Sequence, residues 1–158
     1  FIATGTGVAP FRSMIEYTFE EKRDCVDGQD RDVWLFLGSS WKDHLPYHDT
    51  FRDLADEREN FHYVPTLSRE RYLTDWEGET DYVQQTLPKY VDADAAGSVG
   101  DTAQEWLGVE PATDIDARID PDSMEVYVCG IGAMAGSVRD VVAEFDLDDE
   151  HLRVESYG

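Results

Sequence analysis

A glycine-rich segment near the start of the chain has the residue types that bind phosphate through the backbone. It comprises Gly5, Thr6, Gly7, Val8, Ala9 and Pro10. The apolar residues from Phe1 to Ala3 indicate the end of a buried strand, while Phe11, Met14 and Ile15 repeat with helical spacing, which places Pro10 at the first helical position. Such a strand-to-helix turn offers free backbone N–H groups and the positive end of a helix dipole. The segment predicts a phosphate site, with a purely structural turn as the alternative.

Apolar strands and amphipathic helices alternate along the rest of the chain, which is typical of a doubly wound parallel sheet. We expect further strands at 33–37, 61–67, 126–129 and 152–157, and helices around 47–55, 82–90 and 134–145. With the first strand, this predicts an α/β fold with a five-stranded parallel sheet in one domain over residues 1–158. Residues 92–123, rich in Asp, Ala, Gly and Pro, are expected to form an irregular excursion around the apolar pair Trp106 and Leu107.

The fold class also predicts where a ligand binds. Doubly wound sheets hold ligands at the carboxyl ends of their strands. The candidate site therefore consists of the residues that follow the expected strands, which are 5–10, 38–40, 68–69, 129–132 and the end of the chain.

The charge of the chain is extreme. Asp and Glu number 35 against 13 Lys and Arg, for a net charge of −22, and Lys22, Lys42 and Lys89 are the only lysines. This composition resembles the proteins of salt-loving microbes that keep molar salt inside the cell, where screening relieves self-repulsion; an ordinary acidic surface is the alternative. Nucleic acid is not an expected partner, because a phosphate backbone needs cationic contacts.

Other features narrow the class of protein. No apolar run is long enough to span a membrane and no signal-peptide pattern is visible, so we expect a cytoplasmic protein. Cys25 and Cys129 form no C-x-x-C pair, and the four histidines lack the spacing of metal ligands. We therefore expect neither a disulfide framework nor a metal site.

Five short segments, taken together, resemble the nucleotide-binding domain of the ferredoxin–NADP reductase superfamily. In chain order they are Gly5–Arg12, Leu35–Gly38 with Tyr47 and Phe51, Ser68–Glu70 with Tyr82–Gln84, Tyr127–Gly130 with Met134, and Glu155–Tyr157. The resemblance implies a flavin-binding β-barrel that precedes this domain and is missing from residues 1–158. It also implies an oxidoreductase that passes a hydride between NADP or NAD and FAD, and exchanges electrons with ferredoxin or a similar carrier.

The resemblance implies a role for each site residue. Those of the first segment, from Gly5 to Pro10, would contact the pyrophosphate. The other cofactor-binding residues are Ser68, Arg69 and Tyr82 at the adenosine end, and Gly130 and Met134 at the nicotinamide end. Three more residues would act on the nicotinamide or flavin, namely Cys129 as a positioning sulfur, Glu155 as a ring orienter or proton relay and Tyr157 as a stacking aromatic. The alternatives are a buried core cysteine, a core methionine and an ordinary last strand.

The choice between NADP and NAD stays open. Arg69 suits a 2′-phosphate, because a guanidinium binds phosphate through two donors. Members that prefer NADP often carry Lys or Arg two residues before the tyrosine that corresponds to Tyr82, where this chain has Thr80. Glu79 and Asp81 flank Thr80, and we expect their carboxylates to repel a 2′-phosphate. We place NADP ahead of NAD.

Two other functions compete with this interpretation. The segment Trp76–Gly78 ahead of Tyr82 resembles NADH-using reductases of oxygenases, although Arg71 would compensate for the missing cation. A binding module of another class, which keeps the nucleotide turn but has no catalysis, is the second alternative. An electron-transfer protein of the dihydroorotate-dehydrogenase type is disfavoured, because no cysteine cluster lies near the end of the chain.

Overall fold

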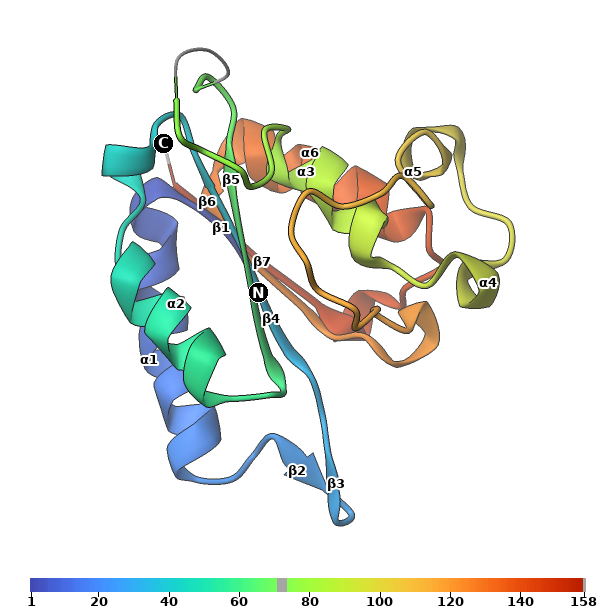
Figure 1. Cartoon of the computed structure of the whole chain (residues 1–158). Helices are drawn as coiled ribbons and strands as arrows, with labels where there is room; N and C mark the ends of the chain where they lie inside the picture. Colours follow the sequence, from blue (N-terminus) through green and yellow to red (C-terminus); the bar gives the residue numbers. More distant parts are fainter. Residues whose placement is uncertain (71–73, 158) are drawn as a thin grey trace.

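The computed structural model describes residues 1–70 and 74–157 (Figure 1). Its centre is a parallel five-stranded sheet in the order β5-β4-β1-β6-β7. The strands are β1 (Ile2–Thr4), β4 (Val33–Ser39), β5 (Phe61–Leu67), β6 (Val126–Ile131) and β7 (Leu152–Tyr157). The order runs outward from β1 in both directions, which confirms the doubly wound α/β fold.

Helices cover both faces of this sheet (Figure 1). One face carries α1 (Val8–Glu20) and α2 (His48–Glu57), and the other carries α3 (Val83–Thr86) and α6 (Gly132–Ala143). Two short helices, α4 (Ala93–Ala96) and α5 (Asp101–Gln104), lie on the side of α3 and α6. None of the helices in the described residues is long and apolar enough to cross a membrane.

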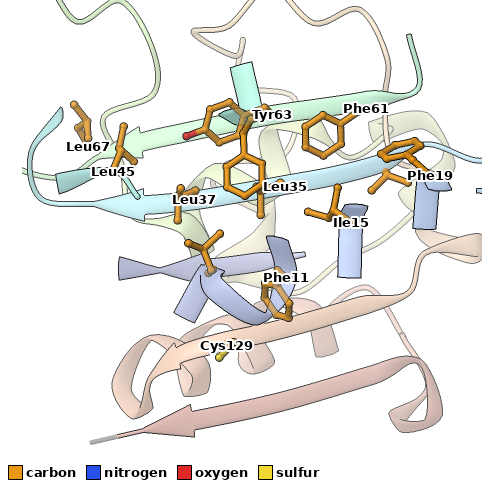
Figure 2. Close-up of a cluster of buried hydrophobic side chains, with 14 residues drawn as sticks. Phe11, Ile15, Phe19, Leu35, Leu37, Leu45, Phe61, Tyr63, Leu67 and Cys129 are labelled. Carbon is orange, nitrogen blue, oxygen red and sulfur yellow. The ribbon is translucent and has the colours of Figure 1, made fainter. Parts of the chain in front are cut away.

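Alternation along the strands divides the core into two layers. Leu35 packs in a cluster with Phe11 and Ile15 of α1 (Figure 2), whereas its neighbours Trp34 and Phe36 belong to the cluster on the opposite face. Successive strand residues point to opposite sides of a sheet, and a strand covered on both sides is therefore apolar throughout. This explains why β4 was visible in the sequence as an unbroken apolar run.

Three local expectations differ from the structure. Helix α1 begins at Val8 and not at Pro10, and Met14, expected on its apolar face, is 37% exposed. The expected helix over 82–90 is α3 followed by a 3-10 turn, Leu87–Tyr90. Pro88 lacks the N–H that an α-helix would use at this position.

A small hairpin was not expected. Strands β2 (Cys25–Val26) and β3 (Gln29–Asp30) pair antiparallel, and Asp27 and Gly28 between them both have positive φ. Asp-Gly is a favoured pair for such a turn. The sequence signal was therefore present, but each flanking strand has only two residues, too few to show an alternating pattern.

The excursion over 92–123 is largely irregular but anchored. It contains α4, α5 and a 3-10 turn, Pro121–Ser123, and its return is fixed by a bridge between Val91 and Ile119. Ala103 of α5 is buried against Val141 and Phe145 in a third apolar cluster.

Candidate functional site

A cavity of about 650 Å³ opens at the carboxyl ends of the strands. Each strand of the sheet contributes to its wall, with Thr4 from β1, Ser39 from β4, Thr66 from β5, Ile131 from β6 and Tyr157 from β7. This is the place where doubly wound sheets bind their ligands.

The turn after β1 needs glycine at two positions. Gly5 has a φ of +52°, in the left-handed region that side chains disfavour. At Gly7, a Cβ would lie 2.8 Å from the carbonyl carbon of Cys129, so the turn packs directly on the backbone of β6. The 3-10 turn Gly5–Gly7 leads without a break into α1.

Two helices begin beside the cavity without a capping side chain. Neither α1 nor α6 has a side-chain hydrogen bond at its N-cap, and neither has an acidic residue in its first turn. In a chain with 35 Asp and Glu residues, these two helix starts therefore keep their full positive end. The positive ends of the two helix dipoles make this side of the cavity attractive to an anion.

The segment after β5 forms the opposite side. Its backbone is tied to the segment after β4, because Ser68 N donates to Ser39 O (3.0 Å) and Arg69 N donates to Ser40 O (3.2 Å). Arg69 is exposed and lines the cavity, and no ion pair engages its guanidinium within residues 1–70 and 74–157. Tyr82 lies at the same side, 58% exposed.

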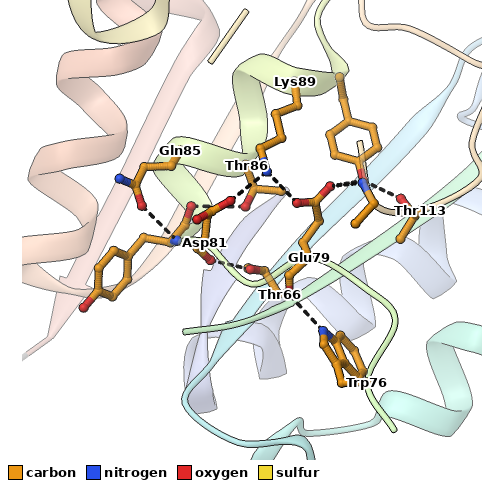
Figure 3. Close-up of polar contacts among 11 residues, drawn as sticks. Thr66, Trp76, Glu79, Asp81, Gln85, Thr86, Lys89 and Thr113 are labelled. Carbon is orange, nitrogen blue, oxygen red and sulfur yellow. Dashed lines mark hydrogen bonds and ion pairs between the residues drawn. The ribbon is translucent and has the colours of Figure 1, made fainter. Parts of the chain in front are cut away.

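A buried polar network lies behind this side (Figure 3). Glu79 is 1% exposed, and its carboxylate accepts hydrogen bonds from Lys89 Nζ (2.8 Å), Tyr90 OH (2.9 Å) and Ala112 N (2.8 Å). Lys89 Nζ also donates to the carboxylate of Asp81, at 2.7 Å. Burial works to lower the pKa of Lys89, but its bonds to the two carboxylates prevail and raise it, so the amine stays charged.

This network corrects one expectation. Glu79 was expected to repel a 2′-phosphate, but its carboxylate is turned inward and does not line the cavity. A bridge to Thr66 fixes its backbone along the edge of β5, and Leu67 N donates to its carbonyl oxygen. Asp81 is the carboxylate that reaches the cavity wall, and it is paired.

At the nicotinamide end of the resemblance, Tyr157 lies against the glycine turn. Its hydroxyl donates to Thr4 O (3.1 Å) and accepts from Thr6 Oγ1 (3.2 Å). The ring is 41% exposed and lines the cavity. Its stacking on a flavin stays a prediction.

Cys129 is buried in the apolar cluster beside Phe11 and does not line the cavity (Figure 2). Burial, together with the charge of Glu155 opposite it in the β6–β7 register, raises the pKa of its thiol. A neutral thiol suits packing or positioning and does not suit a nucleophile. Contact of the sulfur with a nicotinamide stays a prediction, as does the role of the exposed Glu155.

The cavity brings together about half of the expected site residues. Those that line it are Gly5, Thr6, Ser68, Arg69, Tyr82, Met134 and Tyr157. Those that do not are Gly7, Val8, Ala9, Pro10, Cys129, Gly130 and Glu155, of which Val8 is fully buried in the core. Arg71, expected as a compensating cation, lies outside the described residues.

Several lining residues were not predicted from the sequence. Thr4, His44, Thr66, Ala133 and Ser137 all reach the cavity. Thr4 and Thr66 lie in the last two residues of their strands, and Ala133 and Ser137 lie in the first two turns of α6, so a wider margin around the strand ends would have found them. His44 comes from a 3-10 turn, Lys42–His44, that no pattern indicated.

One group of side chains elsewhere has the arrangement of metal ligands. Asp148, Glu150 and His151 place ligand atoms within 4.8 Å of one another, and all three residues are exposed. Exposed acidic groups of this kind are common without an ion.

Comparisons with known proteins agree with this geometry. Residues 1–140 match the family model of the oxidoreductase NAD-binding domain. The chain is 28% identical over 158 residues to ferredoxin–NADP reductase B of Sorangium cellulosum, which covers 99% of the chain and 53% of that protein. It is also 28% identical to one component of the Na⁺-translocating NADH-quinone reductase of Idiomarina loihiensis, over 100% of the chain and 32% of that component.

Among solved structures, the chain is similar to a ferredoxin NADP⁺ reductase from Neisseria gonorrhoeae with bound FAD and NADP. The TM-score is 0.66 at 18% identity, over 98% of this chain and 54% of that one. This likeness confirms the fold. The chain thus spans about half the length of the Sorangium relative and a third of the Idiomarina relative.

Proposed function

The chain belongs to the oxidoreductase NAD-binding domain family, and from this premise we propose that its cavity holds NADP or NAD. One observation carries the proposal above the others. The glycine turn that leads into α1 and the first turn of α6 both line the cavity, and neither helix has a capping side chain or an acidic residue in its first turn, in a chain whose net charge is −22. Such an exception in so acidic a chain supports a site for the pyrophosphate.

The residues around the cavity fit a dinucleotide. The backbone of Gly5–Gly7 would approach the pyrophosphate closely, and Arg69 would bind at the adenosine end. Thr4 supports the fit independently, because its hydroxyl oxygen is buried and has no hydrogen-bond partner in the described parts of the chain. An unpaired buried hydroxyl costs stability, and a polar ligand in the cavity would satisfy it.

We propose that the whole protein is a flavin-dependent ferredoxin–NAD(P) reductase or a close relative. The nicotinamide, when bound, would supply hydride exchange with a flavin. Residues 1–158 would bind and orient the nucleotide, while FAD would be held mainly by another domain and electrons would pass to or from ferredoxin or a similar carrier. Two similar proteins support this proposal, the ferredoxin–NADP reductase of Sorangium and the Neisseria reductase with bound FAD and NADP.

NADP is the preferred nucleotide in this proposal. Arg69 is the one lysine or arginine among the described residues that line the cavity, and the carboxylate of Glu79 is turned away from it. NAD is the alternative, supported by equal identity to a component of an NADH-quinone reductase. A reductase component of an oxygenase would use the same site.

We further infer that the protein works in molar salt in the cytoplasm. Support comes from the 35 acidic residues and from the scarcity of lysine. Repulsion among these charges would be screened by molar KCl, where the Debye length is about 3 Å. Thermal unfolding at several KCl concentrations tests this inference. The unfolding temperature should rise steadily as KCl is raised from about 0.1 to about 2 M. A flat dependence would contradict it.

The nucleotide proposal is tested by calorimetric titration of the chain with 2′-phospho-AMP and with AMP, in molar KCl. If 2′-phospho-AMP binds about tenfold tighter, a gain of about 1.4 kcal/mol, NADP is the nucleotide. Equal or reversed affinities would indicate NAD. A chain that is folded but binds none of the four ligands 2′-phospho-AMP, AMP, NADP and NAD would contradict the proposal.

A further inference from the structure

The charge of the adenosine side depends on one carboxylate. Among the described residues that line the cavity, Asp81 is the only acidic residue and Arg69 the only lysine or arginine. A ligand with a 2′-phosphate would meet both. The state of Asp81 therefore decides whether this side is attractive or neutral to an anion.

Lys89 holds that carboxylate from behind the cavity wall. Its side chain is 6% exposed and does not line the cavity, and its Nζ lies 2.7 Å from Asp81 Oδ2 and 2.8 Å from Glu79 Oε2. Figure 3 shows both carboxylates pointing at the same amine. The face of Trp106 covers Nζ at 5.4 Å from the ring centre.

The rest of the network keeps this arrangement in place. Glu79 has further donors in Tyr90 OH and Ala112 N, so its carboxylate is satisfied without leaving the interior. The backbone of Asp81 is held as well, because Thr66 Oγ1 donates to its carbonyl oxygen. Asp81 thus keeps its carboxylate on Lys89, and one amine is shared by two carboxylates in this trio.

We propose that Lys89 sets the preference of this cavity between a 2′-phosphate and a free 2′-hydroxyl, by pairing with Asp81 so that the charge of Arg69 prevails. The proposal rests on the nucleotide site argued above. Lys89 touches no ligand and is a positioning residue. Without it, Asp81 would present a full negative charge to the 2′-phosphate, while AMP, which lacks that group, would be affected much less.

The test compares the ratio of affinities for 2′-phospho-AMP and AMP among variants of the whole chain. The titrations use two KCl concentrations, namely about 2 M and the lowest at which circular dichroism shows each variant folded. Lys89→Gln should lower the ratio about three- to tenfold, and more at the lower salt concentration, because salt screens a Coulombic effect. Lys89→Arg, which keeps the charge, should restore at least part of the loss.

Two carboxylate variants complete the test. In an Asp81→Asn background, Lys89→Gln should leave the ratio within about twofold, because no carboxylate that lines the cavity is left for Lys89 to pair. Glu79→Gln is the matched control: it removes a carboxylate that shares the same amine but does not line the cavity, and the ratio should change by less than about twofold.

The possible outcomes separate the two proposals. A Lys89→Gln variant that weakens both ligands equally would show a structural role and overturn this inference alone. If the Lys89→Gln variant does not fold, Asp81→Asn decides the matter. A gain of about threefold or less in the affinity ratio would support an Asp81 that is already paired with Lys89. A gain of about tenfold or more would overturn the inference. A wild-type chain that is folded but binds neither ligand would overturn the proposed function, and this inference with it.

Discussion

The two sides of the cavity handle charge in opposite ways. On the side of β1 and β6, the starts of α1 and α6 carry no acidic residue and no capping side chain. On the side of β5, Lys89 and the buried carboxylate of Glu79 lie behind the wall and hold the carboxylate of Asp81, which reaches the cavity. In our proposals, the first side would attract an anion through helix starts without carboxylates, and the second through the pairing of Asp81 with Lys89.

The difference gives two ways in which a strongly acidic chain would accommodate the anionic ligand that we propose. On the side of β1 and β6, the positive charge depends on the absence of acidic residues from two helix starts, which can be read from the sequence. On the side of β5, the charge depends on which acidic side chains are paired, which can be read only from the structure. Each side can therefore be broken by its own kind of substitution.

The largest effect is expected at the buried network. Lys89→Met would leave the carboxylate of Glu79 in the interior without its counter-charge, and breaking a buried pair costs about 3–5 kcal/mol. Denaturant unfolding in molar KCl measures the loss. Lys42→Met is the control, because the pair of Lys42 with Asp75 is exposed and should contribute less than about 1 kcal/mol. Equal losses in the two variants would remove the distinction between the network and a surface pair.

The glycine turn comes next. Gly7→Ala would drive a Cβ into the backbone of Cys129 and should destabilise the chain by about 1–3 kcal/mol, with loss of nucleotide binding. Gly136→Ala is the matched control: Gly136 lies within α6 with no atom near its added Cβ, and alanine there should stabilise by about 0.5–1 kcal/mol. A tolerated alanine at position 7 would contradict the close packing of the turn on β6.

A charge at the start of α1 should separate binding from stability. Ala9→Glu adds a carboxylate to the first turn, which should stabilise the helix by about 0.3–1 kcal/mol through its dipole. The same charge should weaken 2′-phospho-AMP and NADP about tenfold, or by about 1.4 kcal/mol. Ala9→Gln has nearly the same shape without the charge and should do neither. Calorimetric titration measures the expected loss of affinity, and thermal unfolding measures the expected gain in stability. Unchanged nucleotide binding by Ala9→Glu would show that the phosphates bind elsewhere.

The smallest effect is on the pH dependence of the network. Burial raises the pKa of Tyr90 above its ordinary 10.0, and the pKa of Lys89 is also raised above its ordinary 10.5. Both groups hold their protons more tightly in the folded state, so their contribution to stability is complete at about pH 8 and declines as the pH rises towards and above their ordinary pKa values. We expect a loss of roughly 1 kcal/mol between pH 8 and 10.5.

A pair of tyrosine variants checks this slope. Tyr90→Phe should flatten the decline, whereas Tyr17→Phe should leave it unchanged, because Tyr17 is 49% exposed. Urea unfolding at several pH values gives the profile. Identical slopes for the two variants would show that Tyr90 does not carry the effect.

The sheet could be predicted from the sequence because its strands are local patterns. The bounds expected for β5 and β7 are those observed, and the expected turn does follow β1. The 3-10 turn around Pro88 and the hairpin at 25–30 were missed. Each is indicated by only one or two residues, such as a proline or an Asp-Gly pair, and not by a repeating apolar pattern. Periodicity does not detect such elements.

Parts of both sides of the site could be predicted. Glycines and small residues at a strand end indicate the first side, where Gly5 and Thr6 were found, and the family resemblance indicated Ser68, Arg69 and Tyr82 on the second. The second side depends on contacts between residues far apart in the chain, such as Ala112 N with Glu79. The sequence placed Glu79 and Asp81 close to the site but gave no sign that Lys89 pairs with both of their carboxylates.

The most direct test of the nucleotide site is a map of backbone amide shifts in the ¹⁵N-labelled chain, titrated with NADP in molar KCl. We predict the largest shifts at Gly5–Gly7, at the first residues of α1 and α6, and at Arg69. Tyr17 and the hairpin at 25–30 should not respond. Large shifts confined to residues outside the cavity, with the glycine turn unmoved, would contradict the claim that this cavity binds the nucleotide.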